Sequence, residues 1–160
     1  MAVDILLKLD GVKGESKIDE HKEEIDVLSW SWGASQSGTT HTGSGGGSGK
    51  VAVQDVHITK YLDAASSTIM RFCCNGKHVA KGTLLVRKAG EKPVDYLKLD
   101  MEEIIITSVT TGGSGGEDRL TENISLNFAK FKFEYFTQED SGSKGKSAPL
   151  SWDIAANKAA

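Results

Sequence analysis

Cysteine is scarce in this sequence, and its two copies are adjacent. Only Cys73 and Cys74 occur in 160 residues. A disulfide between neighbouring residues is strained and seldom used, and adjacency lacks the two-residue gap with which paired thiolates bind zinc. The histidines are too scattered for a recognisable metal pattern, at His21, His41, His57 and His78. The sequence therefore predicts no metal and no cofactor, and two free thiols indicate synthesis in a reducing compartment.

An excess of charge of one sign is also missing. The chain has 19 basic and 22 acidic residues, a formal net charge of -3, and they are spread along its length. Such a balance makes nucleic acid and an acidic membrane surface unsuitable partners.

The sequence has no long hydrophobic run. Residues 1–11 alternate apolar and polar side chains, with no basic start followed by a continuous apolar stretch. No signal peptide or transmembrane span is visible. We therefore expect no membrane insertion, and export, if it occurs, by a route that recognises the folded protein.

What the sequence does contain is alternation of apolar and polar residues with a period of two, which is typical of half-buried strands. It is clearest at the start, where Val3, Ile5, Leu7 and Leu9 are separated by other residues. Strands are predicted at residues 3–9, 25–32, 51–62, 83–87, 94–107, 124–135 and 150–154.

Some of these strands change phase partway along. In residues 25–32 the apolar positions switch from odd to even numbers, which predicts a bulge that bends the strand. Ser29 and Ser31 then lie on the face opposite the tryptophans. In residues 124–135 the switch runs from even to odd numbers, so this strand is predicted to turn from one sheet into another.

One helix is predicted, with Asp63 as its N-cap and an apolar stripe that includes Ala65, Ile69 and Phe72. Several long, bulged strands favour a closed or nearly closed antiparallel β-barrel, because closure removes exposed edges. A sandwich is the alternative. The fold class is therefore mainly β, with one packed α-helix and long glycine-rich loops. The length suits a single domain over residues 1–160.

The first glycine-rich loop, residues 38–49, resembles a phosphate-binding loop because Lys50 follows it. Ser44 stands where that motif needs its leading glycine, and Val51 stands where it needs a magnesium-binding hydroxyl. A strand follows where the motif needs a helix. Nucleotide binding is therefore not expected.

The second glycine-rich loop contains Gly112-Gly113-Ser114-Gly115-Gly116, which matches the G-x-S-x-G turn of α/β hydrolases. That fold places its histidine after the serine, whereas every histidine here precedes Ser114. A flexible glycine run is also a poor platform for a nucleophile. We therefore interpret the segment as a loop and predict that the chain is not an enzyme.

Ordering either loop has a large cost in conformational entropy. Fixing about ten glycine-rich residues costs on the order of 10–20 kcal/mol in backbone entropy, and residues 38–49 contain no apolar side chain to offset it. The loops should become ordered when a neighbouring surface buries them, as an assembly contact does. Idle surface loops are the other interpretation.

Three long strings carry a resemblance to a known family: HKEEIDVLSWSWGASQSG from His21, GKVAVQDVHITKYLD from Gly49 and VTTGGSGGEDRLTENISLNF from Val109. They resemble the haemolysin-coregulated protein (Hcp) family, which forms the inner tube of the bacterial type VI secretion system. The resemblance runs from Met1 to about Tyr135, and residues 136–160 are less characteristic.

This resemblance implies a β-barrel with a helix beside it, six-fold rings, and rings stacked into a hollow tube. It implies sheath and spike proteins as partners and small effector proteins as cargo inside the ring. It also implies a location in the bacterial cytoplasm, followed by secretion through the apparatus without a signal peptide.

Mapped onto this chain, the resemblance and the glycine content suggest three groups of site residues. Ser29 and Ser31 are predicted to face the lumen. Ring stacking is assigned to Gly38, Gly43, Gly45, Gly46, Gly47 and Gly49, and contact around the ring to Gly112, Gly113, Ser114, Gly115, Gly116, Glu117 and Asp118. The alternatives are a phage-type tail tube protein and, more distantly, a secreted serine hydrolase built on Ser114.

Overall fold

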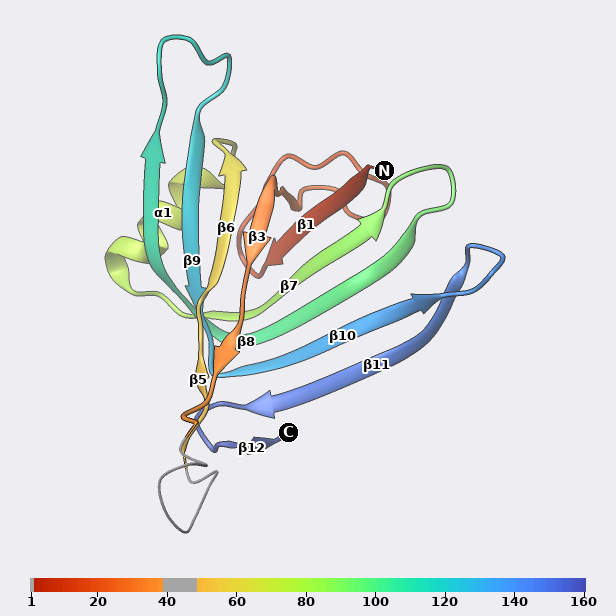
Figure 1. The fold of residues 1–160 in the computed structure, drawn as a ribbon. Helices are drawn as coiled ribbons and strands as arrows, with labels where there is room; N and C mark the ends of the chain where they lie inside the picture. Colours follow the sequence, from red (N-terminus) through yellow and green to blue (C-terminus); the bar gives the residue numbers. More distant parts are fainter. Residues whose placement is uncertain (1, 39–48) are drawn as a thin grey trace.

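The protein is folded almost entirely from strands, as the alternation predicts (Figure 1). This computed structural model describes residues 2–38 and 49–160. Its elements in chain order are β1 (Val3–Leu9), β2 (Ile25–Asp26), β3 (Ser29–Ser31), β4 (Ala34–Ser35), β5 (Ala52–Val53), β6 (Val56–Tyr61), α1 (Ser66–Asn75), β7 (Val79–Lys88), β8 (Val94–Gly112), β9 (Thr121–Asn127), β10 (Lys130–Gln138), β11 (Lys144–Asp153) and β12 (Lys158–Ala159).

Ten of the described strands form one branched antiparallel sheet, and β4 and β5 form a separate antiparallel pair. The main sheet follows the order β12-β11-β10-β8-β7-β1-β2, and a second layer branches from β8 through β9 and β6 to β3. The long strand β8 belongs to both, because its first part pairs with β7 and β10 and its last part pairs with β9. We call this second layer the β3–β6–β9–β8 layer.

The phase changes in the sequence mark the places where the chain passes between the two layers. Residues 25–32 divide into β2 on the main sheet and β3 on the second layer. Residues 124–135 divide in the same way, because β9 pairs within the second layer and β10 pairs with β8 in the main sheet. The predicted turn from one sheet into the other is confirmed.

The barrel is nearly closed where β2 leads into β3. Val27 donates its N–H to the Ile5 carbonyl of β1 at 3.0 Å, and the next residue, Leu28, donates to the Thr59 carbonyl of β6 at 2.8 Å. The chain thus bridges the free margins of the two layers. The predicted nearly closed antiparallel barrel with a packed helix is confirmed.

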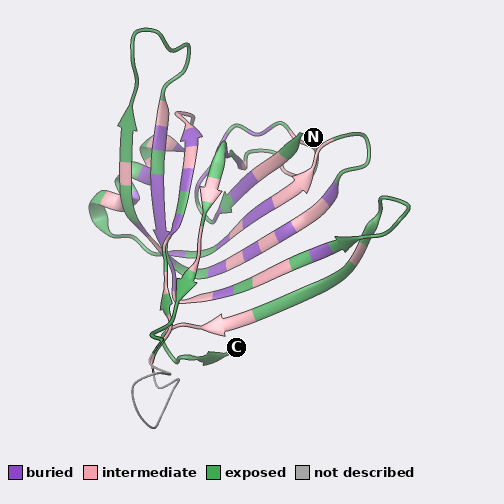
Figure 2. Cartoon of the chain, viewed as in Figure 1, coloured by how far each residue is buried: buried purple, intermediate pink, exposed green. Residues whose placement is uncertain are grey.

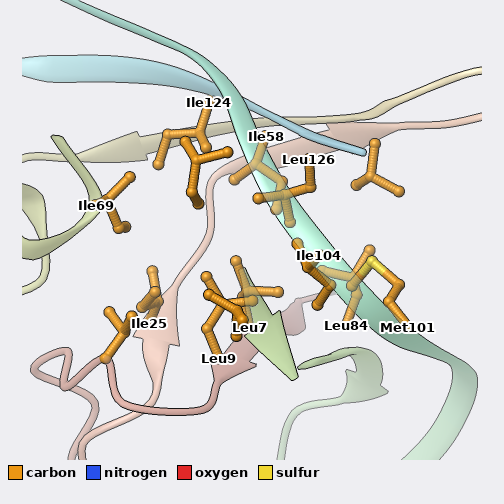
Figure 3. Packing of buried hydrophobic residues seen from close by; sticks show 14 of the residues in the cluster. Leu7, Leu9, Ile25, Ile58, Ile69, Leu84, Met101, Ile104, Ile124 and Leu126 are labelled. Atoms are coloured by element: carbon orange, nitrogen blue, oxygen red, sulfur yellow. The ribbon is translucent and has the colours of Figure 1, made fainter. Parts of the chain in front are cut away.

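The core lies between the two layers and is sealed by α1 (Figure 3). Leu7, Leu84 and Leu99 are fully buried on neighbouring strands of the main sheet. Ile69 and Phe72 of α1 are buried with them, as the helical stripe predicts. Each such side chain contributes about 1.5–3 kcal/mol through removal of apolar surface from water.

Several boundaries differ from the sequence predictions. The helix begins at Ser66 with Ala65 as its N-cap, so Asp63 as N-cap is wrong. Asp63 lies in the preceding turn, where its carboxylate accepts the Ala65 N–H at 2.9 Å. The helix ends as expected, at Gly76 with a positive φ of 66°.

The strand predicted at residues 83–87 begins earlier, at Val79, and runs through Gly82. A Cβ at Gly82 would lie 2.7 Å from a Leu9 methyl and 2.8 Å from an Ile104 methyl. Glycine at this position therefore allows close packing of β7 against side chains from neighbouring strands.

Candidate assembly and lumen surfaces

The β3–β6–β9–β8 layer presents an uncharged polar face on the side away from the core. Its strand register places small polar residues side by side in two rows, while Trp30, Ile58 and Ile124 on the same strands point into the core. The rows consist of Ser29, Thr59, Asn123 and Thr110, and of Ser31, His57, Ser125 and Ser108. We call this surface the polar face.

Most of the hydrogen bonds on the polar face run between its own side chains. The Thr59 hydroxyl donates to Asn123 Oδ1 at 2.7 Å. Ser125 Oγ lies 2.9 Å from His57 Nδ1 and accepts a hydrogen bond from Ser108 Oγ at 2.9 Å. The two rows themselves contain no Lys, Arg, Asp or Glu. Where they end, the Asp55 carboxylate accepts hydrogen bonds from the Thr107 hydroxyl at 2.7 Å and from Asn127 Nδ2 at 2.9 Å.

The two predicted lumen residues lie at the β3 margin of the polar face. Ser29 and Ser31 are both exposed, and Trp30 between them packs against the core. Their predicted position opposite Trp30 is therefore confirmed. Their role in a lumen remains a prediction.

The predicted ring-contact segment forms the turn between β8 and β9. Every residue from Gly112 to Asp118 is exposed. The Ser114 carbonyl accepts the Glu117 N–H at 3.1 Å, and Arg119 lies over the Tyr61 ring at 3.9 Å, which fastens the base of the turn to β6. The turn therefore projects outward as a hairpin tip.

The Ser114 hydroxyl has no histidine beside it among the residues that the structure describes. His57 is hydrogen-bonded to Ser125 and His21 pairs with Glu24, so both rings are engaged elsewhere. The geometry of the described residues thus gives no support to a serine nucleophile at Ser114.

Only the two ends of the predicted stacking segment are described. Gly38 and Gly49 lie next to the β4–β5 pair in the sequence, and a Cβ at Gly49 would require the side chains of Gln36 and Ser37 to shift. Gly43, Gly45, Gly46 and Gly47 lie outside the described residues. Figure 1 shows the β5 end of the molecule and the β8–β9 turn at opposite extremes.

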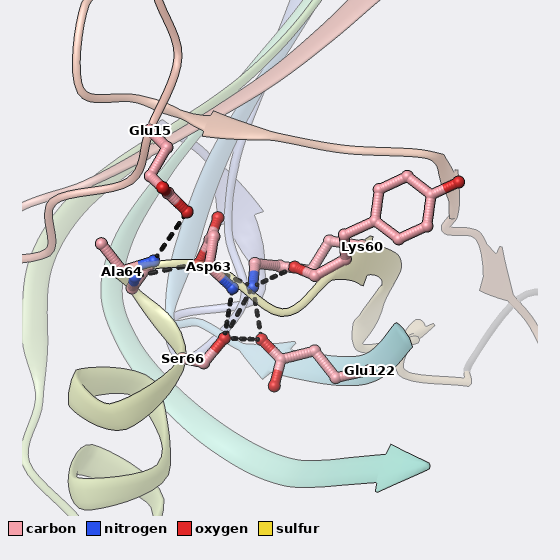
Figure 4. A network of polar contacts seen from close by, with 8 residues as sticks. Glu15, Lys60, Asp63, Ala64, Ser66 and Glu122 are labelled. Atoms are coloured by element: carbon pink, nitrogen blue, oxygen red, sulfur yellow. Dashed lines mark hydrogen bonds and ion pairs between the residues drawn. The ribbon is translucent and has the colours of Figure 1, made fainter. Parts of the chain in front are cut away.

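A buried ionic network that the sequence analysis missed ties α1 to the second layer (Figure 4). Lys60 has no exposed surface and forms ion pairs with Glu122, which is 1% exposed, and with Asp63 Oδ1 at 2.9 Å. Lys60 Nζ also donates to the Tyr61 carbonyl at 2.9 Å, and Ser66 Oγ donates to Glu122 Oε1 at 2.8 Å. The network joins β6, β9 and the first turn of the helix.

A sequence signal for this network exists. Lys60 continues the apolar phase of Val56 and Ile58, and Glu122 continues the phase of Ile124 on the partner strand. Residues 60 and 122 are direct partners in the β6–β9 register. Opposite charges at apolar positions of two strands indicate a buried ion pair once those strands are known to be neighbours.

An acidic cluster lies beside the network. Partial burial, and then the carboxylates of Asp63 and Asp4, raise the pKa of Asp26 above its ordinary value of 3.8, although Arg119 opposes the change. Asp26 therefore takes up a proton at a higher pH than an isolated aspartate does. In the described ranges, no three side chains are placed to bind a metal ion.

The cysteines lie on α1. Cys73 packs partly against the core and Cys74 is exposed. Within residues 2–38 and 49–160, no helix is long and apolar enough to cross a membrane.

Comparisons with known proteins agree with one another. The profile of the family described as "Type VI secretion system effector, Hcp" matches residues 6–135. Protein hcp1 of Pseudomonas aeruginosa is 52% identical over 159 residues, which cover 98% of each chain. The crystal structure of Hcp1 from Salmonella typhimurium is similar with a TM-score of 0.81 and 34% identity, covering 100% of both chains. A solved structure titled as a type six secretion system protein has a TM-score of 0.92 and 29% identity, covering 98% of this chain and 99% of its own.

Proposed function

This chain belongs to the Hcp family of type VI secretion proteins, and from that premise we propose that it is the ring-forming subunit of the type VI inner tube. Six copies form a ring, rings stack into a hollow tube, and small effector proteins travel inside it. Sheath and spike proteins are its partners in the apparatus. The chain is made in the bacterial cytoplasm and leaves through the apparatus.

One observation supports this proposal: the β4–β5 pair, which is next to the first glycine-rich segment in the sequence, and the β8–β9 turn, which contains the second, lie at opposite extremes of the molecule (Figure 1). A stacked ring needs two kinds of heterologous contact, one that closes around the ring and one between rings that does not close, so each subunit needs two separate contact surfaces. The β4–β5 end and the β8–β9 turn supply two such surfaces. In this proposal, residues 38–49 contact the next ring, and Gly112 to Asp118 contact a neighbour around the same ring.

Family membership favours this role over the two alternatives. The relatives are type VI secretion proteins, which makes a phage-type tail tube unnecessary as an explanation. A structural role also agrees with the surroundings of Ser114 described above.

Electron microscopy of the purified protein tests the proposal directly. We expect annular particles, and light scattering should give a mass of six times 17.1 kDa. A stable 17.1 kDa monomer at every protein concentration examined would contradict the proposal.

The polar face is proposed to line the lumen. Its short, uncharged side chains would let an effector rest against the wall without strong attraction, and Ser31 lies at its exposed margin. Ser31→Gln adds bulk there and should reduce the amount of effector protein from the same bacterium that co-purifies with the rings, at least several-fold. Mass spectrometry of the purified rings measures this amount.

The matched control is Ser67→Gln, which makes the same change at an exposed position on α1. Ring formation should survive both substitutions. Equal effector content in Ser31→Gln, Ser67→Gln and wild-type rings would show that Ser31 does not face the lumen.

A further inference from the structure

The core-facing side of the main sheet continues beyond the part that this chain covers. In the strand register, Leu7, Leu84, Leu99, Phe133 and Leu150 form one row across β1, β7, β8, β10 and β11. The first three are fully buried, Phe133 is partly buried, and Leu150 is 53% exposed. One continuous apolar row therefore runs from the core into solvent.

The neighbouring row shows the same gradient. It begins with Ile5 and Leu97, which are partly or fully buried, and continues to Tyr135, which is 48% exposed, and Ala148. Figure 2 shows the burial falling along the sheet toward β11, which is exposed over most of its length. Tyr135 and Leu150 are two of the six large hydrophobic residues found exposed in the described part of the chain.

The free edge of β11 is poorly suited to adding another strand. The Ser151 carbonyl accepts the Ala160 N–H at 3.3 Å, so the backbone groups of residue 151 point away from β10. Because the direction of the backbone N–H and C=O groups repeats every two residues along a strand, those of residue 149 also point away from β10. Position 149 is proline, which has no N–H to donate. A partner is therefore expected on the apolar face of this arm and not on its edge.

Lysines lie near this face, and one of them, Lys144 of β11, is paired with Asp95 at 3.5 Å. Lys88 lies opposite Val3 in the β1–β7 register, and Lys146 lies two residues from Ala148 on β11. Val3 itself is 46% exposed. The face thus combines exposed apolar side chains with lysines at its margin.

The β8–β9 turn has the complementary character. Leu120 is 51% exposed and packs beside Gly113, and the exposed carboxylates of Glu117 and Asp118 lie next to it in the sequence. Apolar contact with opposite charges at the rim is the pattern of a specific protein interface. The turn and the β10–β11 arm lie on different sides of the molecule (Figure 1), so one copy cannot join them itself.

We propose that the apolar face of the β10–β11 arm, formed by Phe133, Tyr135, Ala148 and Leu150, receives the β8–β9 turn of a second copy of this chain. The inference rests on the proposed ring, and it identifies both halves of the contact around that ring. Leu120 enters the apolar face, while Glu117 and Asp118 approach the lysines.

Leu150→Lys tests the receiving face. A lysine there must lose its hydration in the contact, so the subunit concentration at which rings dissociate should rise about tenfold or more. Light scattering over a dilution series measures this, and circular dichroism checks the fold, which should be unchanged at so exposed a position. Met70→Lys on α1 is the matched control, since Met70 is 39% exposed and lies outside the contact.

Cross-linking tests whether the β8–β9 turn of one copy lies against the β10–β11 arm of another. In a background with Cys73→Ser and Cys74→Ser, Leu120→Cys combined with Leu150→Cys should give covalent multimers after diamide oxidation, and either cysteine alone should not. Multimers from Leu150→Cys alone would mean that two arms meet, which overturns the inference. Wild-type rings with an unchanged dissociation concentration for Leu150→Lys would overturn it too, while leaving the proposed function intact; a wild-type monomer would refute both.

Discussion

Replacing Lys60 with methionine should lower the free energy of unfolding by about 3–5 kcal/mol, because it leaves two carboxylates in the interior without their cation. Glu122 is 1% exposed, and the Asp63 side chain is 7% exposed. Water cannot replace the lost ammonium group there. Urea denaturation of wild type and variant under conditions that keep both monomeric measures the loss.

Two further variants separate this cause from ordinary effects of substitution. Lys98→Met removes a lysine that is 43% exposed and 3.9 Å from Asp100, and it should cost less than about 1 kcal/mol. Lys60→Met combined with Glu122→Met should recover part of the loss, because an apolar pair of similar volume replaces the ion pair and only the Asp63 carboxylate is left without the ammonium group. A loss for Lys60→Met no larger than that for Lys98→Met would show that the buried network contributes little.

Deleting residues 38–49 should abolish tubes while preserving rings. The reason is that stacking is proposed to use this segment at one end of the molecule, whereas the ring contact uses the β8–β9 turn and the β10–β11 arm. Electron microscopy should show single annuli at a protein concentration at which the wild type forms stacks. The ring mass in light scattering serves as the internal control for folding.

A deletion variant that still forms tubes at the wild-type concentration would show that the stacking contact lies elsewhere. Loss of rings together with tubes would show that residues 38–49 also act around the ring. Either result changes the assignment of Gly38 and Gly49, which are the first and last residues of the segment.

Much of the architecture was predictable, because local patterns determined it. The phase switches in residues 25–32 and 124–135 predicted the passages from one layer to the other, and the structure places the boundaries β2/β3 and β9/β10 there. The stripe that contains Ile69 and Phe72 predicted α1. These signals are local because a side chain's direction on a strand or helix follows from its position in the sequence.

The remaining features depend on neighbours that are distant in the sequence. Most of β11 lies outside the strand predicted at residues 150–154, because a strand exposed on both sides shows no alternation of apolar and polar residues. The pairing of Lys60 with Glu122 required knowing that β6 and β9 are adjacent. The polar face likewise appears only when β3, β6, β9 and β8 are aligned, so the sequence predicts Ser29 and Ser31 without Thr59 and Asn123 beside them.

The course of β8 has a mechanical consequence for a subunit that is pushed as part of a tube. This strand is a member of both layers, and it is hydrogen-bonded to β7 and β10 along one part and to β9 along the other. Separating the polar face from the main sheet therefore requires shearing many backbone hydrogen bonds together. In the proposed tube, we expect β8 to transmit a force applied at one end of the subunit to both layers. The polar face and the main sheet should then move together.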